Sequence, residues 1–357
     1  MKVLLSAYAC EAGKHHEVWV LTRPDDGRPA IEAFLAEHPN PNLHFVYFTL
    51  PIIGGFWQLG SIPFVLHYYL WQVQAYFVAR RLHRQIEFDL AHVTFVRYST
   101  PSFIALLPIP FLWGTVGGGE AAPAPFWQDF NGRAKLYEWL RFLAHRVGEL
   151  DPFTRMTAQR SRVVRVTTED TAIRVRKLGA KRVEIVPEAS LPIEEIEQLS
   201  HCPLPPASPV RFISMGRLLH WKGFHLGIRA FAAAKLPDAE YWIVGEGKEL
   251  ANLQQLAQDL GVGDRVKFWG KLPRTETLER LGECHVLVHP SLHDSGGWVC
   301  LEGMAAGRPI LCLDLGGPGV QVTGETGIKV PAHTPEQAVK DLATAMVWRM
   351  TRICVGA

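Results

Sequence analysis

The sequence predicts an α/β protein built from two doubly wound domains. From residue 209 to about residue 350, short apolar strands alternate with amphipathic helices, which is the pattern of βαβ units and a parallel sheet. The first 200 residues repeat this alternation less regularly, and a proline-rich stretch at 201–209 follows them. We therefore expect domains at 1–200 and 210–357, a linker at 201–209, and a ligand cleft at the carboxyl ends of the strands.

The first half contains short apolar runs that predict strands. They are Lys2–Tyr8, Glu17–Thr22, His44–Phe48, Asp89–Val93, Phe111–Trp113, Arg162–Thr167 and Arg182–Val186. Thr168 is a good N-cap for a helix over Glu169–Leu178, which Gly179 closes. Only the residues 9–16 separate the first two strands, which is shorter than a parallel crossover normally needs. The first helix of this domain is therefore expected to be missing.

The second half alternates more clearly. The predicted strands are Val210–Ser214, Glu240–Val244, Arg265–Trp269, His285–His289 and Pro309–Asp314. The predicted helices are Phe224–Lys235, Lys248–Leu260, Arg274–Leu281, Trp298–Ala306 and a last one from Pro335 to about Trp348. Thr334 ahead of Pro335 supplies an N-cap with proline in the first turn.

The composition excludes several classes of protein. A formal net charge of +2 is too small to argue for nucleic-acid binding. The six cysteines show no CxxC spacing and several lie in apolar runs, so we expect buried free thiols in a reducing compartment. No signal peptide precedes Met1, and the predicted location is cytoplasmic. No Asp-x-Asp pair is present to hold a metal, and no metal or other cofactor is expected.

One segment of the first half could contact a membrane. The stretch from Phe45 to Ala79 has no Asp, Glu, Lys or Arg, and its aromatic part is followed by a basic cluster at Arg80, Arg81 and Arg84. An aromatic helix over 64–84 could lie peripherally on the inner face of a membrane. The alternative is a surface helix packed on its own sheet.

Two groups of residues predict an anion site in the second half. Gly216-Arg217 ends the first strand of that half, and Lys222-Gly223 opens the next helix. Two cations beside a helix N-terminus suit a diphosphate, although such residues in a loop are often merely solvated. The second group is Asp294-Ser295-Gly296-Gly297-Trp298, with Glu302 a further turn along the helix. The glycines let backbone amides approach an anion, and the buried-looking Glu302 needs partners such as ribose hydroxyls or neighbouring amides.

These residues, in this order, closely resemble the retaining glycosyltransferase family 4 (glycosyl transferases group 1), which has the GT-B fold of two Rossmann-like domains. The resemblance rests on Ser214–Arg217, Lys222-Gly223, Val244–Gly247, His289–Ser291 and the acid-x7-Glu motif from Asp294 to Glu302. It implies that Arg217 and Lys222 bind the donor diphosphate, that Glu302 binds the ribose and that Asp294 lies by the donor sugar. Further donor contacts are implied for the following residues: Gly216, Gly245, Glu246, Gly247, Lys271, Leu272, Ser295, Gly296, Gly297 and Trp298.

The same resemblance extends to the first domain. Gly117-Gly118-Gly119-Glu120 and Cys10-Glu11-Ala12-Gly13 are similar to glycine-rich family loops that face the cleft. His92 matches a family histidine that contacts the transferred sugar, although a lone histidine at a strand end is as often structural. Three features depart from the family pattern. They are Asp294 in place of the usual Glu, the absent first helix, and a C-terminal end that is expected to be truncated.

The resemblance implies a glycosyltransferase that moves a hexose from a UDP- or GDP-sugar to a saccharide or lipid-linked acceptor with retention, in polysaccharide or glycolipid biosynthesis. No residue is an evident covalent nucleophile, which favours a front-face path. The alternatives are a catalytically degenerate GT-B protein that binds nucleotide, a nucleotide-sugar epimerase, and a phosphorylase with pyridoxal phosphate. A dinucleotide dehydrogenase is disfavoured, because no G-x-G-x-x-G follows the first strand.

Overall fold

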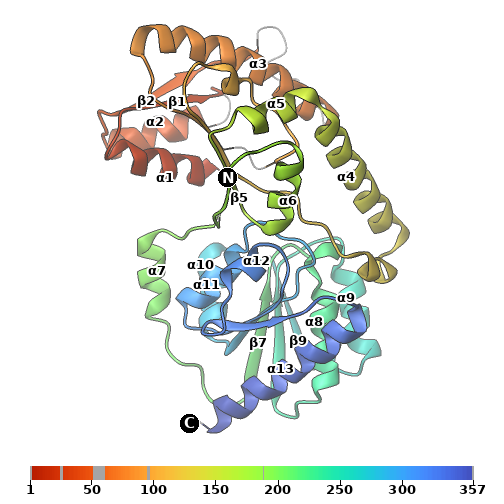
Figure 1. The fold of residues 1–357 in the computed structure, drawn as a ribbon. Helices are drawn as coiled ribbons and strands as arrows, with labels where there is room; N and C mark the ends of the chain where they lie inside the picture. Colours follow the sequence, from red (N-terminus) through yellow and green to blue (C-terminus); the bar gives the residue numbers. More distant parts are fainter. Residues whose placement is uncertain (1, 25–26, 51–60, 95–96, 188, 356–357) are drawn as a thin grey trace.

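The computed structural model describes residues 2–24, 27–50, 61–94, 97–187 and 189–355. Its strands form a six-stranded sheet in the second half, a four-stranded sheet in the first half and a separate two-stranded sheet near the N-terminus. All strand pairs are parallel. Figure 1 shows the two halves stacked, with the first half above the second. Parallel sheets require their faces to be covered, and helices do so here.

The second half contains the larger sheet, in the order β12-β11-β10-β7-β8-β9. Its strands are β7 (Val210–Met215), β8 (Ala239–Val244), β9 (Val266–Gly270), β10 (Val286–His289), β11 (Ile310–Leu313) and β12 (Gly327–Val330). The helices are α8 (Phe224–Ala234), α9 (Leu250–Asp259), α10 (Arg274–Gly282), α11 (Trp298–Ala305), α12 (Gly316–Gln321) and α13 (Pro335–Val355). Apart from β12 and α12, each of these elements was predicted.

Alternate residues of the central strand β7 feed two separate cores. Phe212 packs on one face with residues of α8 and α13, and Ile213 packs on the other with residues of α10 and α11. Both side chains are fully buried. Such burial on both faces explains why this half appears in the sequence as continuous apolar runs. Helix α7 (Ile193–Ser200) also packs on α11, with Leu199 in the second of these cores, although it precedes the predicted linker.

The first half contains the sheet β3-β4-β5-β6. Its strands are β3 (Ala91–Val93), β4 (Phe111–Val116), β5 (Val163–Val166) and β6 (Val183–Ile185). Its helices include α3 (Ser61–Ile86), α4 (Gly132–Leu150), α5 (Pro152–Arg160) and α6 (Glu169–Lys177), with the short η2 (Phe103–Leu106) and η3 (Ala124–Asp129). The core consists of strand residues such as Trp113 and Val164, covered by α3, α5 and α6.

The N-terminal segment differs from its prediction. Residues Lys2–Gly13 form helix α1, not the strand Lys2–Tyr8, and the predicted loop Cys10–Gly13 is the last turn of that helix. Helix α1 packs on the paired strands β1 (Val18–Thr22) and β2 (Leu43–Tyr47). Helix α2 (Arg28–Glu37) connects these two strands in the sequence. The apolar start of the segment is typical of a strand, but its leucines and alanines favour a helix and no proline or glycine interrupts it before Gly13. The short crossover therefore does not arise.

The aromatic helix α3 packs largely on its own domain. Trp71 stacks on Phe48 with ring centroids 4.7 Å apart, and Tyr69 makes edge contacts with Phe103. Phe77 is the aromatic side chain of the described part of 64–84 that is mainly exposed. This packing supports the alternative that α3 is a surface helix packed on its own domain. Residues 51–60 of the charge-free stretch lie outside the described residues.

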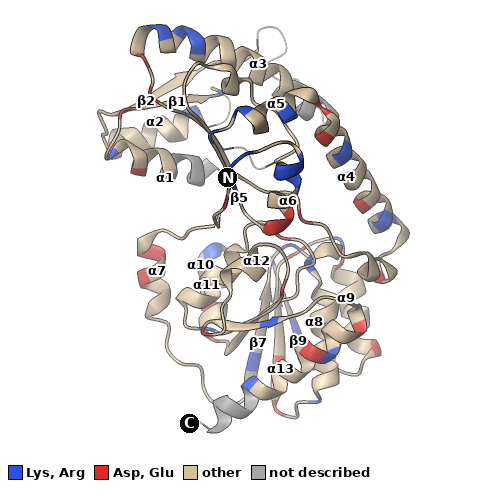
Figure 2. Cartoon of the chain, in the orientation of Figure 1, with Lys and Arg blue, Asp and Glu red and all other residues tan. Residues whose placement is uncertain are grey.

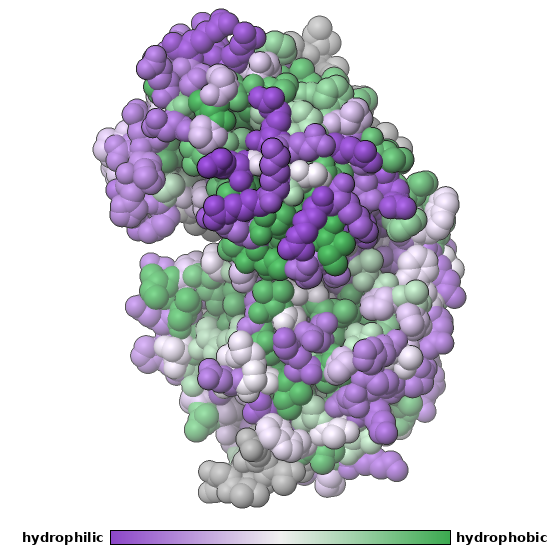
Figure 3. All heavy atoms as spheres, viewed as in Figure 1, coloured by the Kyte–Doolittle hydropathy of each residue, from purple (hydrophilic) through white to green (hydrophobic). Residues whose placement is uncertain are grey.

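The two halves share a continuous core on one side. Phe126 and Phe130, which precede α4, are buried in the same cluster as α8 and α13 of the second half. Asp129 also accepts a hydrogen bond from Arg229 at 2.9 Å. On the opposite side, Figure 3 shows a notch between the first half and the region of α7. In this view, the cleft between the halves opens only on the side of α7.

Candidate functional site

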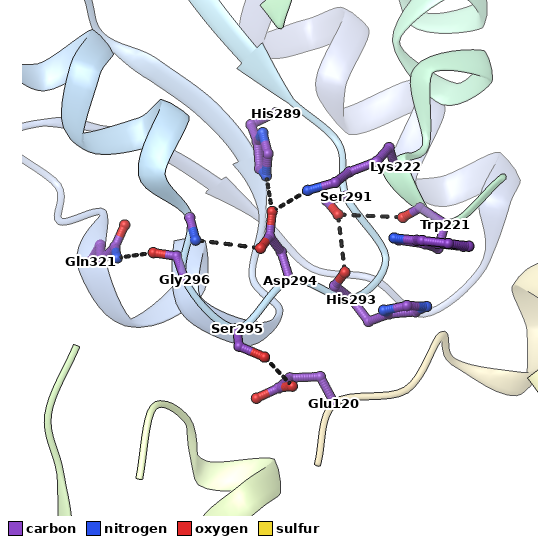
Figure 4. A network of polar contacts seen from close by, with 11 residues as sticks. Glu120, Trp221, Lys222, His289, Ser291, His293, Asp294, Ser295, Gly296 and Gln321 are labelled. Atoms are coloured by element: carbon purple, nitrogen blue, oxygen red, sulfur yellow. Dashed lines mark hydrogen bonds and ion pairs between the residues drawn. The ribbon is translucent and has the colours of Figure 1, made fainter. Parts of the chain in front are cut away.

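The centre of the site is a half-buried carboxylate held by a lysine and a histidine. Asp294 follows β10, and its Oδ2 accepts from Lys222 Nζ at 2.5 Å and lies 3.2 Å from His289 Nε2. Its other oxygen lies 3.4 Å from the backbone nitrogen of Gly297, which donates to it. Figure 4 shows Lys222 and His289 converging on Asp294. Burial alone would raise the pKa of Asp294, but His289 and the positive Lys222 outweigh it and hold that pKa well below its usual range.

The backbone brings these residues together through a close approach of two loops. Lys222 ends the single turn η4 (His220–Lys222), and Gly223 then adopts a φ of 66° before α8 begins. A Cβ on Gly223 would lie 1.9 Å from the carbonyl oxygen of Pro290, so only glycine fits there. Leu292 also donates its backbone N–H to Trp221 at 2.8 Å. The loop after β7 and the loop after β10 are thus fixed side by side at the carboxyl edge of the sheet.

The N-terminus of α11 faces the same region. Gly297 is its N-cap with a φ of 57°, and Gln321 donates to the Gly296 carbonyl at 2.5 Å. The first amides of a helix have no partner within the helix, and they carry its positive end. The Gly297 amide already donates to Asp294, and the role of Gly296, Gly297 and Trp298 in an anion site stays a prediction.

Glu302 is buried, and its partner was not predicted. Arg274 of α10 donates to Glu302 Oε1 at 2.6 Å and also pairs with Glu195 of α7. Burial raises the pKa of Glu302 above its usual value, and the positive Arg274 opposes that shift. Arg274 and Glu195 line a cavity of about 300 Å³ together with Pro192, Glu194, Gln198, Thr275 and Leu278.

The remaining predicted donor residues lie on the loops after β7, β8 and β9. Gly245 has a φ of 139°, and a Cβ there would clash with the Gly216 carbonyl oxygen, so these two loops touch. Glu246 pairs with Lys271 at 3.4 Å, and both side chains are largely exposed. Arg217 is exposed and makes no ion pair within the described part of the chain. The other predicted members of this set are Gly247, whose Cβ position faces the Leu218 carbonyl, and Leu272, whose carbonyl accepts from Thr277.

The glycine-rich loop of the first half meets the acidic loop of the second directly. Ser295 Oγ donates to Glu120 Oε2 at 2.7 Å, and the Gly118 amide donates to Ser295 Oγ at 3.2 Å. A Cβ on Gly117 would lie 2.9 Å from Ser295. Glu120 is buried and accepts from the hydroxyls of Thr167, Thr168 and Thr171, the last of which also holds the Gly119 amide. Burial raises the pKa of Glu120, but the hydrogen bonds from Thr168 and Ser295 outweigh burial and bring this pKa below its usual value.

A second contact between the halves involves Glu138, which sequence analysis missed. This residue of α4 is 3% exposed, and its Oε1 lies 2.9 Å from His220 Nε2 and 3.1 Å from His293 Nε2. These histidines stand near Lys222 and immediately before Asp294. Trp221 stacks between Tyr137 and His293, with centroids 5.1 and 5.3 Å away. Burial raises the pKa of Glu138, but hydrogen bonds from the two histidines lower it to about 2.

Two predicted first-domain residues lie among other partners. His92 is half-buried on β3, and its Nε2 pairs with the Gly114 carbonyl while its ring meets that of Tyr8 edge-on. Burial lowers the pKa of His92. Gly13 ends α1, and its carbonyl accepts from Asn42 at 3.1 Å. The structure shows no contact of either residue with the Lys222–Asp294 pair, and their roles at the sugar and the cleft stay predictions.

Comparison with known proteins identifies the second half. Residues 200–347 match the family model for Glycosyl transferases group 1. The second half is therefore similar to a glycosyl transferases group 1 domain. The matched residues include Lys222, Asp294 and Glu302.

Two curated proteins similar to part of this chain are glycosyltransferases. The lipopolysaccharide core biosynthesis glycosyltransferase LpsE of Rhizobium meliloti is 37% identical over 161 residues, which are 42% of this chain and 46% of LpsE. The D-inositol 3-phosphate glycosyltransferase of Corynebacterium glutamicum is 30% identical over 151 residues, 40% of this chain and 36% of that protein. The chain thus matches less than half the length of these two relatives.

Solved structures show the fold of the whole chain. Anabaena Alr3699/HepE in complex with UDP and glucose aligns with a TM-score of 0.57 at 18% identity, covering 99% of this chain and 88% of that one. The apo form of the lipopolysaccharide outer core galactosyltransferase WaaB aligns with a TM-score of 0.54 at 12% identity, covering 87% of this chain and 76% of that one. The predicted GT-B fold, with two Rossmann-like domains, is confirmed.

The described residues lack two kinds of feature. They contain no group of three or more His, Cys, Asp or Glu side chains arranged to hold a metal ion. Among them, no helix combines the length and the apolar character that crossing a bilayer requires.

Proposed function

We propose that this protein is a retaining glycosyltransferase that moves a hexose from a UDP- or GDP-sugar to a saccharide or lipid-linked acceptor. The observation that carries the proposal is Lys222, held on half-buried Asp294 beside the N-terminus of α11 in a half that matches the glycosyl transferases group 1 model. The glycosyltransferase relatives support it, and so does the fold shared with a protein solved with UDP and glucose. Lipopolysaccharide relatives favour polysaccharide or glycolipid biosynthesis.

The proposed chemistry is the departure of a nucleoside diphosphate. Its two negative charges need fixed positive groups that do not rearrange during the reaction. We assign this role to Lys222, to the exposed Arg217 and to the amides at 296–298, without a metal ion. Asp294 fixes the lysine ammonium and stays ionised, because its pKa is held far below neutral pH. Lys222 then lies in one orientation before the donor arrives.

Glu302 is proposed to bind the donor ribose. Its carboxylate is already bonded to Arg274 through Oε1, which leaves Oε2 to accept from a hydroxyl. Asp294 and the first-domain loop at Gly117–Glu120 would border the sugar. We propose a front-face path with retention, because no residue of the site stands out as a covalent nucleophile. Peripheral membrane contact through 64–84 and a location on the inner face of a membrane stay proposals.

The test is a donor screen on wild type, Lys222→Ala and Glu302→Ala, with the exposed Lys181→Ala as the matched control. UDP- and GDP-sugars are offered, and thermal stabilisation and release of UDP or GDP are measured. We expect wild type and Lys181→Ala to be stabilised and to release one nucleotide, and the two site variants to lose release by at least about a hundredfold. Nuclear magnetic resonance of the product then gives the anomeric configuration, and inversion would refute retention.

A second candidate is a degenerate domain that binds nucleotide without turnover. It is favoured by one observation, namely that Lys222 and Glu302 both already have internal charged partners. Stabilisation by a nucleotide without release of product in any acceptor screen would support this candidate. The absence of any stabilisation by UDP- or GDP-sugars would contradict both.

A further inference from the structure

Helix α4 exposes most of its apolar side chains and buries charged ones. Apart from Ala134, the side chains that it buries are polar, with Glu138 and His145 inside and Arg141 and Glu149 half-buried. The side chains that it exposes are largely apolar. The exposed set is Leu136, Trp139, Leu140, Phe142, Leu143, Val147 and Leu150, and each is 44% exposed or more. In a water-soluble monomer the hydrophobic effect favours the opposite arrangement.

The exposed apolar residues form one face, which we call the α4 face. Their spacings of three and four residues place them on one side of a helix with 3.6 residues per turn. With a rise of 1.5 Å per residue, the face from Leu136 to Leu150 spans about 21 Å of the helix. Figure 1 shows α4 along the outer edge of the molecule, away from the sheets. Apolar surfaces of this extent mark contact with a partner or a membrane.

The exposed charged side chains of α4 are basic, and one of them, Arg146, pairs with the half-buried Glu149. Arg133, Lys135 and Arg146 are exposed on the same helix, and Arg146 lies over the ring of Phe142. The acidic residues of α4 point elsewhere, since Glu138 is buried at the second domain and Glu149 is held by Tyr98, Arg174 and Arg146. Figure 2 shows the basic residues along α4. Apolar side chains flanked by exposed cations suit an anionic lipid surface.

We propose that the α4 face docks this protein on the surface of an anionic phospholipid bilayer. The apolar side chains enter the boundary between head groups and acyl chains, and the three cations meet lipid phosphates. A second copy of the chain fits this surface less well, because pairing two such faces brings cations against cations with no exposed acid on α4 to offset them. The proposal concerns lipid binding alone and is independent of the donor and of turnover.

The test uses the full chain and vesicles. Wild type is sedimented with vesicles of phosphatidylglycerol and phosphatidylcholine, and separately with phosphatidylcholine alone. The variant carries Leu140→Gln and Leu143→Gln, and the matched control carries Leu204→Gln and Leu260→Gln, which are exposed in the second half. Because Leu140 and Leu143 are exposed, the variant should fold, and its melting temperature is measured to verify this.

We expect wild type and control to bind the anionic vesicles, the variant to bind at least about tenfold more weakly, and salt to weaken binding. Absence of binding to anionic vesicles, or equal binding by variant and wild type, would overturn the proposal. Light scattering gives the oligomeric state of the free protein. A dimer that the double variant dissociates would assign the α4 face to a second copy instead and would also overturn it.

Discussion

Glu138→Gln is the substitution that best tests how the two halves are held together. The carboxylate is buried between His220 and His293, and its pKa falls from 4.5 to about 2 on folding. Each pKa unit corresponds to about 1.4 kcal/mol, so the ionised Glu138 contributes about 3 kcal/mol to the free energy of unfolding at neutral pH. Glutamine keeps one acceptor and the shape but loses the charge, so we expect a loss of about 2–3 kcal/mol at pH 7.

The pH dependence of the free energy of unfolding provides a second test of the same interaction. A carboxylate whose pKa is lowered by folding stabilises the protein above its unfolded pKa of 4.5, and this contribution disappears as the pH falls towards 2. The stability difference between wild type and Glu138→Gln should therefore be constant above about pH 5 and shrink below pH 4.5. Urea unfolding followed by tryptophan fluorescence at pH 7, 5 and 3 measures it.

The matched control for this experiment is Glu325→Gln, which alters an exposed glutamate with the same change of charge. It should leave the free energy of unfolding within about 0.5 kcal/mol of wild type. A Glu138→Gln protein that is equally unaffected at pH 7, or whose deficit at pH 3 is as large as at pH 7, would refute the assignment of Glu138 as an ionised link between the halves.

Two further substitutions test the loops of the site. Gly223→Ala forces a Cβ to within 1.9 Å of a backbone oxygen. The control is Gly261→Ala, which has a similar φ of 68° but open space around the Cβ position and should lower the free energy of unfolding by about 1–2 kcal/mol. Urea denaturation should show a larger decrease for Gly223→Ala than for this control. Arg274→Met removes the cation that opposes the raised pKa of Glu302. Because a raised folded pKa costs stability as the pH rises above 4.5, urea unfolding at pH 4 and pH 7 should show a larger drop for Arg274→Met than for wild type, and an equal drop would contradict this.

The second half could be predicted almost completely because its strands are buried on both faces. β10 and β11 appear as unbroken apolar runs, and Gly307 and Thr334 mark where helices end and begin. The strand β12 was missed because Lys329 interrupts a run of only four residues, and α12 because its glycines and proline show no helical period. In the first half, the apolar pattern of Lys2–Gly13 fits a strand or a helix. The structure has a helix there, and this helix packs on β1 and β2.

The site could be predicted as a set of residues but not as a set of contacts. Lys222 and Asp294 were both placed at the donor diphosphate and sugar, yet their direct pairing depends on the close approach of two loops about seventy residues apart. Arg274 and Glu138 have no local motif. A charged residue in an amphipathic helix is normally assigned to the solvent side, and in α4 the exposed and buried sides are exchanged.

That exchange has a physical explanation within the structure. The inner side of α4 lies against His220 and His293, whose ring nitrogens require an acceptor, and a polar residue such as Glu138 satisfies them there. Glu138 therefore occupies the inner side even though the helix is rich in apolar residues, and these residues turn outward. Because α4 is one rigid helix, a surface that holds its outer side also fixes Glu138, and through the two histidines it restrains the loops that hold Lys222 and Asp294. Under the proposed docking, lipid binding and the order of the donor site would share this one helix.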